Sequence, residues 1–128
     1  MADVLVDTSA WIEFFRHPRS RAAETVDQLI QADAACVTGV VLAELLRGTR
    51  TAQERTLLLS RLTPLRFLEA TQQVWIAIGT LAATLSQGGL TLPLTDLLIA
   101  AVAQAHDCTV YATDAHFTRI PHLKLHTL

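Results

Sequence analysis

Four acidic side chains fall where a folded chain can bring them together. Asp7 directly follows the aliphatic run of residues 4–6, and Asp114 follows a second strand-like run. Glu44 lies inside an apolar helical segment, and Asp96 lies in the first turn of a later helical segment. Carboxylates packed together repel one another, and each one that loses water is costly. A hard divalent cation resolves this conflict, because Mg²⁺ or Mn²⁺ takes oxygen ligands from a few carboxylates.

Each acid also has a purely structural explanation. Asp96 favours the N-terminus of its helix through the helix dipole, and Asp114 is a typical turn residue. Glu44 can be an ordinary exposed helix acid, although a charge among so many apolar neighbours asks for a partner. The coincidence of four acids, more than any one of them, indicates a metal site.

The elements that must position these acids alternate along the chain. Short apolar or β-branched runs predict strands at residues 4–6, 34–38, 64–68 and 109–113, with a weaker fifth at 123–126. Helical spacing and capping residues predict helices at residues 8–15, 20–32, 40–47, 51–62, 71–87 and 95–106. Alternation of this kind predicts an α/β protein with a parallel sheet covered on both faces. The carboxyl ends of parallel strands share one edge, so Asp7 and Asp114 are expected to meet there.

Length and composition predict a single domain over residues 1–128. No apolar run is long enough to span a membrane, and the first residues lack the pattern of a signal peptide. Cys36 and Cys108 lie in apolar runs and are interpreted as small buried residues of a cytoplasmic protein. Hydrophobic residues make up 51% of the chain and charged residues 17%. The high share of hydrophobic residues indicates either a partner-binding face, including a homodimer face, or a tightly packed small core.

The formal net charge of −2 gives the whole molecule no general attraction for nucleic acid. Three arginines nevertheless fall together in the segment from Arg16 to Arg21, and arginine suits bidentate phosphate contacts. A solvated loop is an equally good interpretation of that cluster. The five histidines have no Ser or Cys partner at a recognisable spacing and suggest no zinc site; His116 is expected to face its loop and the others the solvent.

Four ordered segments resemble the acidic motifs of PIN domains: Val-Leu-Val-Asp7-Thr-Ser, Glu44-Leu-Leu-Arg-Gly48, Asp96-Leu-Leu-Ile-Ala-Ala101 and Thr113-Asp114-Ala-His-Phe117. The length and the segments are similar to those of VapC-like toxins from bacterial and archaeal toxin–antitoxin pairs, from residue 3 to about residue 125. The resemblance implies a three-layer α/β/α fold with a central parallel sheet of four or five strands. Its implied strand order is 3-2-1-4-5, which puts residues 4–6 at the centre.

The resemblance further implies a metal-dependent endoribonuclease that is usually a homodimer and is held inactive by a cognate antitoxin. The family's metal-site positions, with Mg²⁺ or Mn²⁺ as cofactor, correspond to Asp7, Glu44, Asp96 and Asp114. A metal-activated water would hydrolyse an RNA phosphodiester without the 2′-hydroxyl and leave a 5′-phosphate.

Other residues are expected to support this chemistry or to bind partners. Hydrogen bonds to a ligand carboxylate or to the phosphate are expected from Thr8, Ser9 and Thr113, whose alternative role is capping and turn formation. Contacts to the RNA backbone or to the antitoxin are expected from Arg16, Arg19, Arg21, Arg47 and Arg50. A partner-binding face, or else part of the core, is expected from Trp11, Phe14, Phe15 and residues 57–59.

Two other classes of function remain open from the sequence. A PIN-like module can grip RNA or a partner without cutting, although the complete set of acids argues against it. An aspartyl-phosphate phosphotransfer or receiver domain also places an Asp after its first strand. Haloacid-dehalogenase enzymes need a second Asp where this chain has Ser9, and a receiver needs a late lysine, for which Lys124 is the only candidate.

Overall fold

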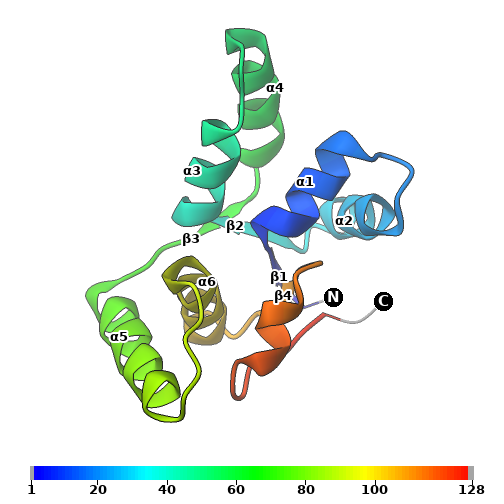
Figure 1. Ribbon diagram of the computed structural model, residues 1–128. Coiled ribbons are helices and arrows are strands. Elements are labelled where there is room, and N and C mark those ends of the chain that lie inside the picture. The colour runs from blue at the N-terminus through cyan, green and yellow to red at the C-terminus, as the bar shows by residue number, and fades with distance from the viewer. Residues whose placement is uncertain (1, 127–128) are drawn as a thin grey trace.

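The fold is organised around a short central strand in a computed structural model that describes residues 2–126 (Figure 1). The sheet has four strands in the order β3-β2-β1-β4, and all three strand pairs are parallel. Their bounds are β1 Val4–Val6, β2 Ala35–Thr38, β3 Arg66–Leu68 and β4 Thr109–Tyr111. The predicted α/β class and the order of the first four strands are therefore confirmed.

Every residue of β1 is buried, as the uninterrupted aliphatic run predicts for a strand covered on both faces. Leu5 pairs with Cys36 of β2 on one side and with Val110 of β4 on the other. Strand β3, at one edge of the sheet, exposes Arg66 and Phe67, as an edge strand after a proline does. Because β1 is central, the helix that directly follows it begins in the middle of the sheet's carboxyl edge.

The predicted fifth strand is reduced to a single bridge in the described residues. Leu125 pairs in parallel with Val110, supported by the bond from the N–H of His126 to the carbonyl of Val110 at 2.8 Å. The position beside β4 agrees with the expected order. Before this bridge the chain turns at Pro121 and at His122, whose φ of 63° is in the left-handed region.

Within residues 2–126, six α-helices and a 3₁₀-helix accompany the sheet. Their bounds are α1 Thr8–Arg16, α2 Arg21–Gln31, α3 Gly39–Arg47, α4 Ala52–Leu62, α5 Gln72–Gln87, α6 Leu94–Ala105 and η1 Ala115–Arg119. In Figure 1, α1 lies against α2, α5 lies against α6, and α3 with α4 forms an arm that extends away from the sheet. The side chains of Ser20, Thr51 and Thr71 cap α2, α4 and α5 as their spacing predicts.

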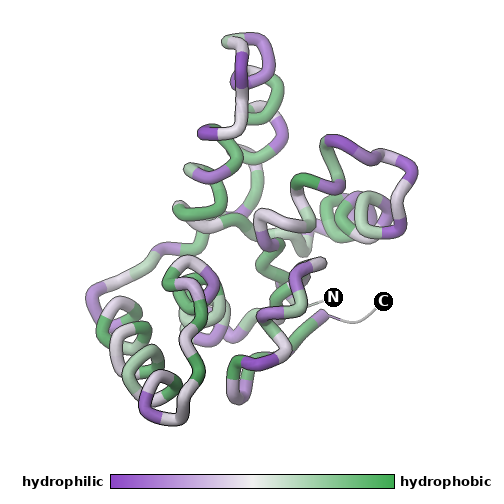
Figure 2. The backbone as a smooth tube through the Cα atoms, viewed as in Figure 1, coloured by the Kyte–Doolittle hydropathy of each residue, from purple (hydrophilic) through white to green (hydrophobic). Residues whose placement is uncertain are grey.

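The core lies between the sheet and the helices. In α6 every residue from Leu97 to Ala103 is buried, so this helix is apolar all round. In contrast, hydrophobic and hydrophilic positions alternate along α2 and α4, while the central strand β1 is hydrophobic (Figure 2). No helix within residues 2–126 combines the length and the apolar character needed to cross a membrane.

Candidate metal centre

Asp7 stands at the carboxyl end of β1 and is the N-cap of α1. Its carboxylate oxygen Oδ2 accepts hydrogen bonds from the backbone N–H of Ser9 at 3.0 Å and from the hydroxyl of Ser9 at 2.7 Å. The sequence interpretation of Thr8 and Ser9 as the capping residues was therefore wrong by one or two positions. Asp7 is the cap because its side-chain oxygen accepts the backbone N–H of Ser9.

Only 5% of Asp7 is exposed, and burial raises the pKa of its carboxyl group. The hydrogen bonds from Ser9 oppose this rise in pKa, and the charge of nearby Asp96 adds to it. A buried strand thus ends in a carboxyl group that is costly to ionise and that already faces a second acid.

Asp96 lies in the first turn of α6, as predicted, and belongs to the same cluster. Burial is the main cause that raises its pKa, and the charges of Asp114 and Glu44 raise it further. His116 lowers the pKa of Asp96, because its ring nitrogen Nδ1 lies 3.2 Å from the carboxylate oxygen Oδ2. The electrostatic interactions of Asp96 therefore connect it to each of the other three predicted acids.

Asp114 is the N-cap of η1, just beyond β4. Its oxygen Oδ1 accepts the backbone N–H of His116 at 2.9 Å and lies 3.4 Å from the ring nitrogen Nδ1 of the same residue. The sequence interpretation of His116 as a loop-facing side chain was incomplete, because the ring turns toward Asp96 and Asp114. The only sequence signal was its place two residues after a predicted ligand, on a turn whose geometry the sequence does not specify.

Glu44 reaches the same region from α3. Its Oε1 accepts a hydrogen bond from the hydroxyl of Thr8 at 2.8 Å, which is the partner that a charge in so apolar a helix requires. Thr113 contributes through its backbone N–H, which donates to the hydroxyl oxygen of Ser9 at 3.0 Å. Among the three predicted supporting residues, Thr8 and Ser9 therefore hold two of the acids directly, and Thr113 acts one contact further away.

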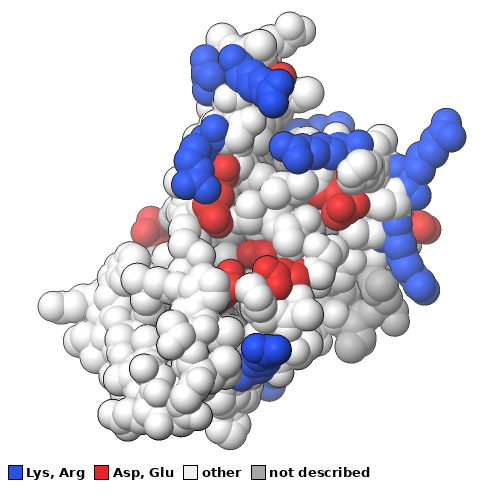
Figure 3. All heavy atoms as spheres, viewed as in Figure 1, with Lys and Arg blue, Asp and Glu red and all other residues white. Residues whose placement is uncertain are grey.

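The four acids come from separate parts of the chain, on β1, α3, α6 and the turn after β4. Figure 3 shows acidic groups collected near the middle of one face of the molecule, with basic groups around them on the arm and over α1 and α2. This set fits a hard divalent cation by the chemistry of its donors, since all four acids offer oxygen. It also fits by electrostatics, since a cation removes the repulsion and the desolvation cost that raise the pKa of Asp7 and Asp96.

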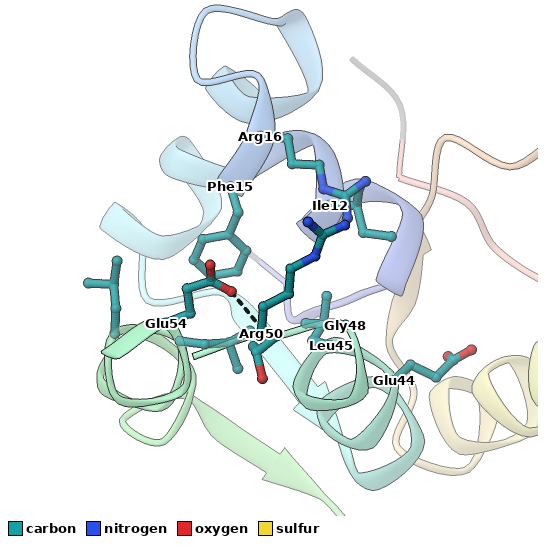
Figure 4. Close-up of a pocket in the computed structure, with 11 residues that line it drawn as sticks. Ile12, Phe15, Arg16, Glu44, Leu45, Gly48, Arg50 and Glu54 are labelled. Carbon is teal, nitrogen blue, oxygen red and sulfur yellow. Dashed lines mark hydrogen bonds between the residues drawn. The ribbon is translucent and has the colours of Figure 1, made fainter. Parts of the chain in front are cut away.

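A groove next to the acids carries two of the predicted arginines. It has a volume of about 650 Å³ and is lined by residues of α1, α3 and α4, with Glu44 at one end. In Figure 4, Arg16 from α1 and Arg50 from the α3–α4 connection extend toward one another, and the carboxylate of Glu54 accepts the backbone N–H of Arg50 at 2.9 Å. The groove thus combines two arginines and two glutamates, Glu44 and Glu54, with the apolar side chains of Phe15 and Leu57.

The other predicted arginines lie elsewhere. Arg19 lines a second groove, between α1, α2 and α4, while Arg21 and Arg47 are exposed on the surface. The predicted partner-binding aromatic group divides as well: Trp11 is fully buried, whereas Phe14 and Phe15 are partly buried and border the grooves. Leu57 is 59% exposed and lines both grooves.

Comparisons with known proteins agree with this geometry. The family model described as "PIN domain" matches residues 4–123. The VapC ribonuclease Mb1587 of Mycobacterium bovis is 31% identical over 118 residues, which cover 89% of this chain and 88% of that protein. Ribonuclease VapC11 of Mycobacterium tuberculosis matches with the same identity and coverage. The DNA-bound VapBC structure from Salmonella typhimurium superposes with a TM-score of 0.80 at 21% identity, covering 98% of each chain.

Proposed function

Because this chain belongs to the PIN domain family, we propose that it is a metal-dependent endoribonuclease and the toxin of a toxin–antitoxin pair. We propose further that residues 1–128 form a single catalytic domain. Contacts among four acids from four elements support the proposal. Asp96 and Asp114 offer ligand atoms within 4.8 Å of each other, and Asp96 interacts through its charge with Asp7 and with Glu44. The names of its relatives, VapC ribonucleases, supply the substrate class.

In this proposal Asp7 and Asp96 hold the metal, and Asp114 and Glu44 complete its ligand set directly or through water. Bound Mg²⁺, or Mn²⁺, lowers the pKa of a coordinated water and neutralises charge on the scissile phosphate. The protein's own contribution is to hold the acids in place. Ser9 fixes Asp7 through two hydrogen bonds, and Thr8 fixes Glu44 through one. No side chain needs to act as a nucleophile.

The groove beside the acids suits an antitoxin segment that combines apolar and charged side chains, because two arginines and two glutamates line it. Leu57 and Phe15 offer apolar contacts, while Arg16 and Arg50 offer charge-assisted hydrogen bonds. RNA is the alternative ligand for the same arginines, because guanidinium groups also bind phosphate bidentately. The titles of similar structures, which include a VapBC complex from Rickettsia felis bound to promoter DNA, support the antitoxin as a partner.

A homodimer is proposed on the exposed apolar side chains outside the groove. Trp75 is 50% exposed and Ile76 63% exposed on α5, and Phe67 is 45% exposed on the edge strand β3. These side chains bury apolar surface when a second copy covers them. A cytoplasmic location is proposed on the two cysteines, which are free and buried; burial raises the pKa of Cys36 to about 12 and keeps it as an unreactive thiol.

The test is cleavage of a structured RNA by the purified chain with and without added Mn²⁺. We expect metal-dependent cleavage by the wild type and a loss of at least about a hundredfold in Asp96→Asn, because one ligand charge is removed without a change of shape. Asp27→Asn is the matched control, since Asp27 is an exposed acid on α2. Cleavage by Asp96→Asn at the wild-type rate, or none by the wild type, would reject the nuclease.

A second experiment addresses the toxin role. The chain is expressed with and without the product of the neighbouring gene, and the 5′ ends of cellular RNA are mapped. Growth arrest that the neighbour relieves, together with new 5′ ends, is expected. Growth unaffected by expression of an active nuclease would contradict the toxin assignment alone.

A further inference from the structure

His116 lies inside the acidic cluster although its residue type was not expected there. Its Nδ1 is 3.2 Å from Oδ2 of Asp96 and 3.4 Å from Oδ1 of Asp114. One ligand atom from each of these three residues falls within 4.8 Å of the other two. We propose that His116 is itself a ligand of the proposed metal, and that its nitrogen makes the site favour a divalent transition ion over Mg²⁺. This inference rests on the metal site of the proposed function.

The distances agree with neighbouring ligands around one ion. In an octahedral site with metal–ligand distances of about 2.0–2.1 Å, adjacent ligand atoms lie about 3 Å apart. The separations of Nδ1 from the two carboxylate oxygens are close to that value. The ring also faces both acids at once, whereas a hydrogen bond from one N–H needs only one acceptor.

Burial and local structure keep the ring available for this role. The side chain of His116 is 49% exposed, while that of Asp96 is 14% exposed, so the ring lies on the solvent side of the carboxylate. The backbone N–H of His116 donates to the carboxylate of Asp114, so the first turn of η1 holds the ring close to that carboxylate. An ion entering from solvent therefore meets the imidazole together with the acids.

The consequence is a change in metal preference. Mg²⁺ takes oxygen ligands and releases water reluctantly, so a nitrogen donor adds little to its affinity. Imidazole is a good ligand for first-row transition ions, and their affinity for mixed nitrogen and oxygen sites rises along the series from Mn²⁺. A site of four acids alone lacks this source of discrimination. His116 thus supplies selectivity that the carboxylates do not.

The test uses Mn²⁺ bound to the full chain as a spectroscopic probe. Pulsed electron paramagnetic resonance detects the ¹⁴N nucleus of an imidazole that coordinates Mn²⁺ directly. We expect ¹⁴N modulation in the wild type and its loss in His116→Gln, which keeps a polar side chain but removes the ring. The variant should bind Mn²⁺ about tenfold or more weakly and Mg²⁺ with a smaller loss. His122→Asn is the control, because it removes an exposed imidazole and Asn tolerates the left-handed backbone there.

The outcomes separate this inference from the proposed function. Stoichiometric Mn²⁺ without ¹⁴N modulation, in a wild type that cleaves RNA, would overturn the histidine ligand and leave the nuclease standing. Absence of any stoichiometric Mn²⁺ binding would overturn both. Equal losses of Mn²⁺ and Mg²⁺ affinity in His116→Gln would overturn the selectivity.

Discussion

The hydroxyl of Ser9 offers a sharp test of how the protein holds its acids. This group donates to Asp7 at 2.7 Å and accepts the backbone N–H of Thr113 at 3.0 Å, so it ties the end of β1 to the chain after β4. In Ser9→Ala the backbone bond to Asp7 remains, and the hydroxyl bond is lost. A hydrogen bond to a charged group contributes about 1.5–3 kcal/mol. Because the bond is already present without the metal, this energy sets an upper bound on the loss of affinity for Mn²⁺, roughly 10- to 150-fold.

The loss should depend on pH in a defined direction. The hydroxyl bond lowers the pKa of Asp7 against the rise caused by burial. Its removal raises that pKa further, so protons compete with the metal up to a higher pH. The affinity difference between Ser9→Ala and wild type is therefore expected to be largest in acid and to shrink as pH rises. Titration calorimetry with Mn²⁺ at several pH values measures it.

A matched control is Ser60→Ala, because the hydroxyl of Ser60 donates to the carbonyl of Leu57 within α4 and is exposed, away from the acids. This variant should bind Mn²⁺ as the wild type does. Ser9→Ala with wild-type Mn²⁺ affinity at every pH would refute the view that the hydroxyl holds Asp7 for the metal. An affinity loss that grows with pH would refute the electrostatic explanation.

Three further predictions concern stability. Asp7→Asn should raise the melting temperature of the metal-free protein, since Asn also caps a helix and the burial cost that raises the pKa of Asp7 disappears. Mn²⁺ should not raise the melting temperature of this variant further. A metal-free melting temperature below that of the wild type would contradict the prediction. The carboxyl pKa values of Asp7 and Asp96 are raised above 3.8, so the folded state binds more protons there than the unfolded state. The contribution of Asp7 and Asp96 to stability should therefore increase as pH falls from neutral toward these raised pKa values. Thermal melting in EDTA, compared with the Asp7→Asn/Asp96→Asn double variant, measures this contribution. A contribution that decreases as pH falls would be inconsistent with burial as the cause of the raised pKa values. Leu62→Ala should cost about 2–5 kcal/mol in urea unfolding, because this 1% exposed side chain anchors α4 to the core; a cost below 1 kcal/mol would mean that the arm contributes little.

The sequence was informative where burial on both faces leaves little choice of structure. The run at residues 4–6 has no polar face, which predicts a strand buried on both faces, and every residue of β1 is buried. Its central position, which the family resemblance implied, is also observed. Parallel strands end at a common edge, which is why Asp7 and Asp114 could be placed together without coordinates. Glu44 was predicted to need a partner and has Thr8. In each case one physical constraint was enough.

Prediction failed where several weak contacts decide the geometry. The strand expected to reach Thr113 ends at Tyr111, because the N–H of Thr113 donates to Ser9 instead of continuing a ladder. That side-chain contact joins residues 104 positions apart, and no local pattern encodes it. The position of the His116 ring depends in the same way on the short turn of η1. Residue types and their spacing suggested which acids to consider, but tertiary contacts decided what surrounds them.

The cluster is held together by contacts that do not require a metal. Asp7 is fixed by Ser9, Glu44 by Thr8, and Asp114 by the backbone of His116. At the same time burial and like charges raise the pKa of Asp7 and Asp96, so the arrangement opposes ionisation of its own carboxyl groups. A protein that holds mutually repelling carboxyl groups in place by hydrogen bonds gains stability when a cation enters. Metal binding should therefore stabilise a site that is already formed.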